Sequence, residues 1–110
     1  MNSEDRKAAV AAYKERKSVA GIYTIRCAAG GLWVGKSPNL DTVQNRHWFT
    51  LRLGGNSCRS LQQAWNQHGA DSLTFAIVER LAEEESAYVR AAVLKDRLAH
   101  WRAALDAQVL

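Results

Sequence analysis

Two short runs near the start of the chain decide the fold: GIYTIR at residues 21–26 and LWVG at residues 32–35. The first run alternates in polarity, and both runs are rich in β-branched and aromatic residues, which is typical of strands. The sequence AAGG at residues 28–31 lies between them, and its two glycines favour a turn. We therefore predict a β-hairpin at residues 21–35.

Two helices are predicted directly after the hairpin. Ser37-Pro38-Asn39 ends the second strand and starts a helix that runs to about Leu53, before a Gly-Gly pair. Ser57 or a neighbour is expected to cap the next helix, which ends at Gly69. The inward-facing residues are predicted from helical spacing: Leu40, Val43, His47 and Leu51 in the first helix, and Leu61, Ala64, Trp65 and His68 in the second.

The C-terminal third of the chain predicts one more strand and a long helix. LTFAIVE at residues 73–79 alternates as a strand does, and Glu83-Glu84-Glu85 suits the first turn of a helix that runs to about Ala107. The expected buried stripe of this helix comprises Tyr88, Ala91, Leu94, Leu98, Trp101 and Leu105.

The order of these elements predicts an α/β (α+β) fold. A helix at residues 3–17, capped by Ser3, belongs to an N-terminal helical extension at residues 1–19, and the domain proper occupies residues 20–107. The order α-β-β-α-α-β-α is compatible with a small three-stranded antiparallel sheet flanked by helices. A length of 110 residues suits one domain.

Composition narrows the functional classes. A hydrophobic fraction of 47% indicates a globular chain, and a net charge of +4 permits but does not demand a polyanionic partner. The two cysteines, Cys27 and Cys58, are too few and too far apart for a disulfide framework or a zinc site. The polar start and the lack of a long apolar run lead us to expect a cytoplasmic protein without a membrane partner.

Several motifs resemble those of the GIY-YIG nuclease superfamily. Gly21-Ile22-Tyr23 matches its first tripeptide, and Trp33-Val34-Gly35 follows at the usual short spacing with Trp in place of the usual Tyr. Similar segments continue through most of the chain, roughly from residue 20 to residue 105: KSPNL at 36–40, NRH at 45–47, LQQAWNQHG at 61–69, FAIVE at 75–79 and LKDRLAHW at 94–101.

The resemblance implies a metal-dependent phosphodiesterase site. In that family one divalent metal, Mg²⁺ or Mn²⁺ if this chain is active, is held by a Glu of the last helix, and the motif tyrosines orient or deprotonate water. An Arg and a His four residues apart face the phosphate. Tyr23 and His47 match their positions, whereas Trp33 replaces the second tyrosine, and an indole cannot act as a base.

Two positions depart from the family pattern in a way that bears on cleavage. The position of the Arg holds Val43, for which Arg46 is a partial substitute, and the position of the metal-binding Glu holds Leu98. Glu79, at the end of the third strand, is the nearest alternative acid and a weak candidate metal ligand. Asp96 is two residues from Leu98 and should point elsewhere on the helix.

Other residues point to nucleic-acid binding. We expect a nucleic-acid-binding set on the active face comprising Lys36, Arg46, Arg52, Asn56 and Arg59. Trp33, Trp48 and Trp65 add candidate stacking surfaces.

Three functions stay open on the sequence alone. The first is a GIY-YIG domain that binds DNA or another nucleic acid with weak or lost cleavage. The second is an active divalent-metal-dependent DNA endonuclease with a rewired site formed by Tyr23, His47, Arg46 and Glu79. The third is a protein-interaction module that uses the same scaffold to bind a second copy of the chain or another protein.

Overall fold

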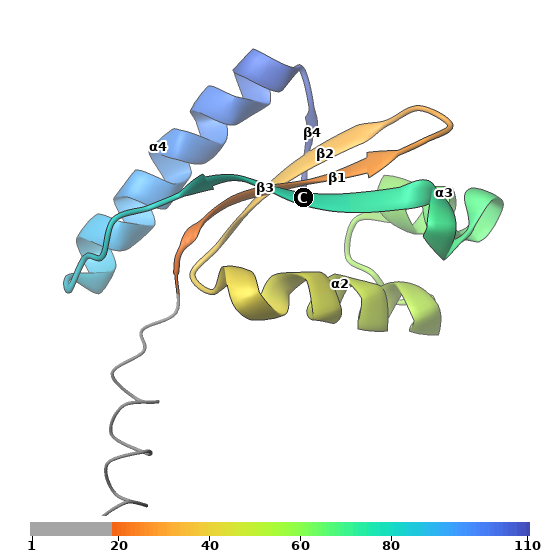
Figure 1. Cartoon of the computed structure of the whole chain (residues 1–110), viewed down its shortest axis with the longest axis horizontal. Helices are drawn as coiled ribbons and strands as arrows, with labels where there is room; N and C mark the ends of the chain where they lie inside the picture. The colour runs from red at the N-terminus through yellow and green to blue at the C-terminus, as the bar shows by residue number, and fades with distance from the viewer. Residues whose placement is uncertain (1–18) are drawn as a thin grey trace, which may run out of the picture.

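The computed structural model of the chain describes residues 19–110, so the helix predicted at residues 3–17 lies outside the described residues. A four-stranded sheet with the order β3-β1-β2-β4 forms its centre (Figure 1). The strands are β1 at Gly21–Cys27, β2 at Leu32–Ser37, β3 at Leu73–Arg80 and β4 at Gln108–Val109.

The predicted hairpin is confirmed. Strands β1 and β2 pair antiparallel from Gly21 opposite Ser37 to Arg26 opposite Leu32. Two consecutive glycines in the turn both have a φ of 115°, a conformation that residues with a side chain rarely adopt. Strand β3 pairs antiparallel with the other edge of β1, which makes β1 a central strand.

The prediction of three strands was one strand short. After α4 the chain reverses at Asp106, whose φ of 49° lies in the left-handed region. The following residues then pair parallel with β2, and the backbone N–H of Leu110 donates to the carbonyl of Val34 at 2.9 Å. Strand β4 is only two residues long and depends on this contact with a distant strand, so local sequence patterns do not indicate it.

In the described part of the chain, three helices cover the two faces of the sheet. Helices α2 at Leu40–Leu53 and α3 at Arg59–His68 lie on one face, and α4 at Ala87–Leu105 crosses the other (Figure 1). A short 3₁₀ turn at Ala70–Ser72 leads into β3. Within residues 19–110, no helix has the length and apolarity to cross a membrane.

The ends of α2 form as predicted. The Asn39 side chain accepts a hydrogen bond from the backbone N–H of Asp41, and Gly54 ends the helix with a φ of 77°.

The starts of the other two helices differ from the predictions. Helix α3 begins after Cys58, a neighbour of Ser57, but the Cys58 side chain makes no capping hydrogen bond. Helix α4 begins after Ser86, whose hydroxyl accepts from the N–H of Val89. The acidic run at residues 83–85 therefore precedes the helix instead of forming its first turn, and α4 also ends two residues before Ala107.

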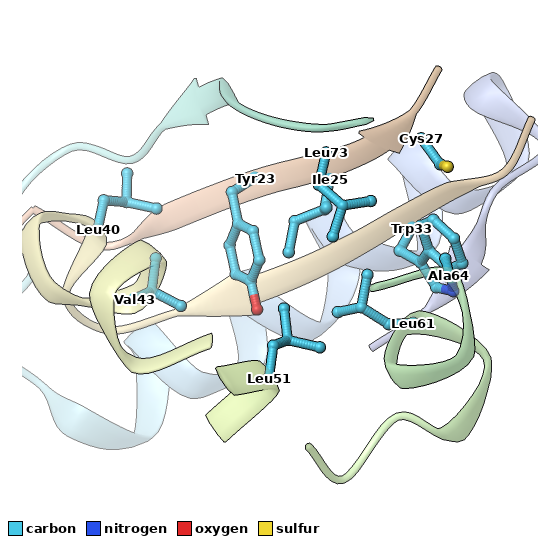
Figure 2. Close-up of a cluster of buried hydrophobic side chains, with 10 residues drawn as sticks. All are labelled: Tyr23, Ile25, Cys27, Trp33, Leu40, Val43, Leu51, Leu61, Ala64 and Leu73. Atoms are coloured by element: carbon cyan, nitrogen blue, oxygen red, sulfur yellow. The ribbon is translucent and has the colours of Figure 1, made fainter. Parts of the chain in front are cut away.

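The sheet separates two apolar clusters. The cluster between the sheet and helices α2 and α3 is shown in Figure 2, where the Tyr23 side chain points from β1 towards α2. Its buried members are Tyr23, Ile25, Cys27, Trp33, Leu40, Val43, Leu51, Leu61, Ala64 and Leu73. The cluster beneath α4 contains Ala20, Ile22, Val34, Leu94 and Ala107, with Leu98, Trp101 and Leu105 packed against it.

Most of the predicted inward-facing residues lie in or against these clusters, but three of them are exposed. His68 and Ala91 are exposed, and Tyr88 retains 85% of its surface. Each lies near an end of its helix, where the sheet no longer covers the helical face.

Candidate functional site

Tyr23 is held under the surface by its neighbours in the sheet. Its ring stacks on Phe75 of β3 at a centroid distance of 5.3 Å, and only 3% of the residue is exposed. Gly35 lies directly across the hairpin from it, and a Cβ at that position would lie 2.5 Å from the phenol oxygen. The glycine of the second tripeptide therefore makes room for the tyrosine of the first.

His47 brings helix α2 into contact with this tyrosine. It occupies the stripe of α2 that also buries Val43 and Leu51, because the three positions recur at helical spacing. Its Nε2 atom lies 2.7 Å from the hydroxyl oxygen of Tyr23. The two predicted site residues that match the family pattern thus form a direct polar contact.

Asn56, in the loop between α2 and α3, completes the cluster. Its Nδ2 atom lies 3.1 Å from Nδ1 of His47 and 2.9 Å from the hydroxyl oxygen of Thr50. The backbone N–H of Asn56 donates to the side-chain oxygen of Gln62. The sequence predicted a contact of Asn56 with nucleic acid, and the structure places its side chain against His47. The sequence did not predict that Thr50 and Gln62 contact Asn56. Thr50 could have been identified, because it follows His47 by three residues and lies on the same side of α2.

The electrostatics of the cluster are positive. Burial raises the pKa of Tyr23 to about 12, although the Arg46 guanidinium opposes this rise. Burial lowers the pKa of His47, and the same guanidinium lowers it further. Within residues 19–110, no carboxylate is among the groups that act on either side chain. At neutral pH the pair is therefore uncharged, with one cation beside it.

Arg46 acts electrostatically on both Tyr23 and His47. Two exposed residues that the sequence did not predict as site residues lie on the same side of α2. Phe49 is 59% exposed and Leu53 is 70% exposed. They follow Arg46 by three and seven residues, spacings that keep all three on neighbouring rows of one helical face. An exposed aromatic ring next to an arginine is the signal that could have identified Phe49.

Two other predicted cations lie at different positions around the site. Arg52 is six residues from Arg46, which places it about 120° away around the helix, and its Nε donates to the carbonyl of Trp48 at 3.3 Å. Arg59 is exposed in the first turn of α3, close along the chain to Asn56.

Lys36 and Glu79 lie on the other face of the sheet. Both are paired with Ile22, which belongs to the cluster beneath α4, whereas the next residue, Tyr23, points towards α2. The structure therefore separates Lys36 and Glu79 from the Tyr23–His47 contact.

Trp33 takes a position inside the core. It is 3% exposed, and its indole N–H donates to the Ser60 hydroxyl at 2.9 Å, so no ring face is free to stack on a base. Trp48 and Trp65 make an edge-to-face contact with each other at 6.1 Å and are half-buried.

The residues at the positions implied to bind metal and phosphate do not fit a resident divalent cation. Val43 is 4% exposed within the core, and Leu98 packs beneath α4. Glu79 instead accepts hydrogen bonds from Arg97 Nε and Trp101 Nε1, both at 2.7 Å. In the described part of the chain, no three His, Cys, Asp or Glu side chains gather as metal ligands would.

Comparison with known proteins finds matches among solved structures but not among family models or curated sequences. No family model matches the chain, and a search of curated proteins finds no match. Two solved structures do match. One is a mutant of the catalytic domain of intron endonuclease I-TevI, with 25% identity and a TM-score of 0.68 over 80% of this chain and 84% of that one. The other is the catalytic domain of homing endonuclease I-TevI, with 23% identity and a TM-score of 0.69 over 83% and 97%.

The chain belongs to the GIY-YIG superfamily. The match covers 84% and 97% of the two solved catalytic domains, so the likeness extends over most of the fold. Within it, the Tyr of the first tripeptide, the Gly of the second and the helix His form one packed unit. The second tripeptide contributes a core tryptophan.

Proposed function

We propose that this GIY-YIG domain binds nucleic acid through its phosphates and cleaves it weakly or not at all. The observation that carries the proposal is the environment of the Tyr23–His47 contact. Arg46 supplies a positive charge beside it, and no carboxylate of the described residues, 19–110, acts on it. A phosphate oxygen is attracted to such a place, whereas a divalent cation is repelled unless anionic ligands accompany it.

Efficient hydrolysis needs groups that are missing from this cluster. A tyrosine with a pKa of about 12 stays protonated at neutral pH and is a poor base. The positions that would carry the phosphate-facing Arg and the metal-binding Glu are Val43 and Leu98. Loss of a single preorganised electrostatic group typically slows an enzyme by about 100- to 1,000-fold, so two such losses favour binding without efficient cleavage.

Salt-dependent binding tests this function. Fluorescence anisotropy with labelled single-stranded, duplex and branched DNA and with RNA should give affinities that fall steeply as salt rises, because bound phosphates release counterions. The same substrates with Mg²⁺ or Mn²⁺ should remain uncut, or be cut only slowly. Binding that is undetectable, or that does not respond to salt, would overturn the proposal.

An active endonuclease is the second candidate, favoured by the 2.7 Å contact between Tyr23 and His47. Metal-dependent cleavage that disappears in both Tyr23→Phe and His47→Ala would replace the first proposal with this one. Cleavage that survives both substitutions would point to a contaminating nuclease.

A protein-interaction module is the third candidate, favoured by the exposed Tyr88, Val89 and Val93 near the start of α4. Light scattering on the purified chain would detect a second copy bound through this face. A stable dimer that binds no nucleic acid would support this function over the other two.

A further inference from the structure

The hydrogen bonds around Asn56 have a fixed direction. The backbone N–H of Cys58 can only donate, and it lies 2.9 Å from Oδ1 of Asn56. Rotating the amide by half a turn would bring the Asn56 NH₂ group against that N–H, two donors face to face. The oxygen of Asn56 must therefore point to Cys58, and its NH₂ group must point to His47.

Thr50 gives the same orientation by a separate route. Its hydroxyl donates to the backbone carbonyl of His47 at 3.0 Å, with that of Arg46 at 3.2 Å as the alternative acceptor. With its proton used in this way, the Thr50 oxygen is an acceptor, and the Asn56 atom 2.9 Å from it must be the NH₂ donor.

The orientation of Asn56 determines which nitrogen of His47 carries the proton. Nδ1 of His47 faces an NH₂ donor at 3.1 Å, so it must be the unprotonated, accepting nitrogen. The neutral ring then has its hydrogen on Nε2, which lies 2.7 Å from the Tyr23 oxygen. That oxygen accepts from His47, which leaves the hydroxyl hydrogen of Tyr23 free to point elsewhere.

We propose that Asn56 is a positioning residue that holds His47 in the Nε2–H tautomer and thereby makes Tyr23 a hydrogen-bond donor to a phosphate oxygen. The phosphate in this statement rests on the function proposed above, whereas the direction of the hydrogen bonds rests on geometry alone. In the described part of the chain, Tyr23 has no other acceptor for its proton within hydrogen-bond distance. The Arg46 guanidinium beside it would attract the same anion.

The proposed direction also gives a reason why this pair is a poor base. In the Nε2–H tautomer, His47 has no lone pair facing Tyr23 and cannot take its proton. Among the residues that the structure describes, the groups that act on the ring are Tyr23 of β1, Arg46 of α2 and Asn56 of the loop, and none of them is an anion that would draw the proton to Nδ1. A protonated ring would place an N–H against the Asn56 NH₂ group, which disfavours the charged form.

The tautomer can be measured without any ligand. Long-range ¹H–¹⁵N NMR of the imidazole groups in the full ¹⁵N-labelled chain, at a pH above the titration of His47, reports which ring nitrogen is protonated. We expect Nε2 in the wild type. In Asn56→Asp, one carboxylate oxygen still accepts from Cys58 and the other accepts from the ring, so the proton should move to Nδ1 and the His47 pKa should rise.

Ser57→Asp is the matched control. Ser57 is exposed, so this variant adds the same charge one residue away, where it replaces none of the contacts of His47. We expect the wild-type tautomer in Ser57→Asp. Asn56→Asp should also weaken DNA binding about tenfold more than Ser57→Asp, since reversal of the relay turns the Tyr23 hydrogen inward and removes a bond to a charged phosphate.

The outcomes separate the two proposals. A wild-type ring protonated on Nδ1, or an Asn56→Asp ring still protonated on Nε2, overturns the role of Asn56. Equal DNA affinities of Asn56→Asp and Ser57→Asp overturn the donor role of Tyr23. If NMR shows the expected tautomers but the chain binds no nucleic acid, the proposed function is overturned and the positioning role of Asn56 stands. If Asn56→Asp does not fold, Asn56→Ala replaces it in the NMR test. A His47 ring that is still protonated only on Nε2 in Asn56→Ala would also overturn the positioning role of Asn56.

Discussion

The hydroxyl oxygen of Tyr23 and the Nε2 atom of His47 lie 2.7 Å apart and join the central strand of the sheet to helix α2. The contact lies within a mostly apolar cluster, where a polar group without a partner is costly. It therefore contributes to the stability of the fold as well as to the candidate site. Variants that disturb the contact must therefore be compared both for stability and for nucleic-acid binding.

Gly35→Ala should disrupt this contact without changing either partner. The new Cβ would lie 2.5 Å from the phenol oxygen and 2.6 Å from the ring carbon that bears it, so the phenol must move. Overpacking of this kind typically costs about 1–3 kcal/mol. Urea unfolding should show a loss in that range, and the NMR signals of His47 should shift. Gly55→Ala, where a Cβ meets open space, is the control. Unchanged His47 signals in Gly35→Ala would contradict the close packing.

Arg46→Ala should weaken nucleic-acid binding more than Arg52→Ala. Both arginines are exposed on α2, but only Arg46 acts electrostatically on Tyr23 and His47. Removal of one phosphate contact reduces the slope of log affinity against log salt by about 1. Anisotropy titrations at several salt concentrations measure this slope. Equal slopes for the two variants would argue against a phosphate site next to Tyr23.

The sequence predicted the parts of this site that depend on local pattern. The hairpin and the buried stripe of α2 follow from alternation, turn glycines and helical spacing, whereas the resemblance to the family identified Tyr23 and His47 as site residues. Lys36 was misplaced although a signal was present. It lies three residues after Trp33 in the same strand, and an odd spacing puts two residues on opposite faces.

Glu79 could not be placed from the sequence. Simple alternation puts Ile77 and Glu79 on one face, and Ile77 does pair with Tyr23. A register shift in the pairing of β1 and β3 then brings Glu79 opposite Ile22, on the face of α4. Bulges of this kind leave no local signature in the strand sequence, so the candidate metal ligand was assigned to a site that it does not reach.

Glu79→Gln therefore tests the endonuclease alternative. Hydrogen bonds from Trp101 and then Arg97 lower the pKa of Glu79, so it contributes stability above its ordinary pKa of 4.5 that is lost as the pH falls through the lowered value. The contacts are partly exposed, and we expect a loss of about 1 kcal/mol or less at neutral pH. DNA affinity should not change. Loss of a metal-dependent cleavage activity in this variant would instead make Glu79 a metal ligand.

His47 should make the stability of the fold depend on pH. Its pKa is lower in the folded chain than the ordinary value of 6.5, so in the pH range just below 6.5 the unfolded state binds more protons. The free energy of unfolding should therefore fall as the pH drops from about 6.5 towards the pKa of His47 in the folded chain. At higher pH the titration of His47 should not change it. Urea unfolding between about pH 5 and pH 8 measures the effect. His47→Gln should flatten this part of the curve, and His68→Gln, at an exposed position, should not. Parallel curves for His47→Gln and the wild type would contradict the assignment.

Phe49 should give the domain a preference for unpaired bases. Its ring is 59% exposed on the flank of α2 that carries Arg46, so a nucleotide whose phosphate contacts the guanidinium could place its base on the ring. Stacking of one base on an aromatic side chain is worth about 1–3 kcal/mol by alanine substitution, and bases inside a duplex are not free to stack in this way. Phe49→Ala should thus reduce affinity for single-stranded DNA about fivefold or more and change duplex affinity little, whereas Phe49→Trp should preserve both. Tyr88→Ala removes an even more exposed aromatic residue from α4 and should affect neither substrate. Equal losses for single-stranded and duplex DNA in Phe49→Ala would mean that the ring supports the helix surface and not a base, and the preference would then have to come from the phosphate contacts alone.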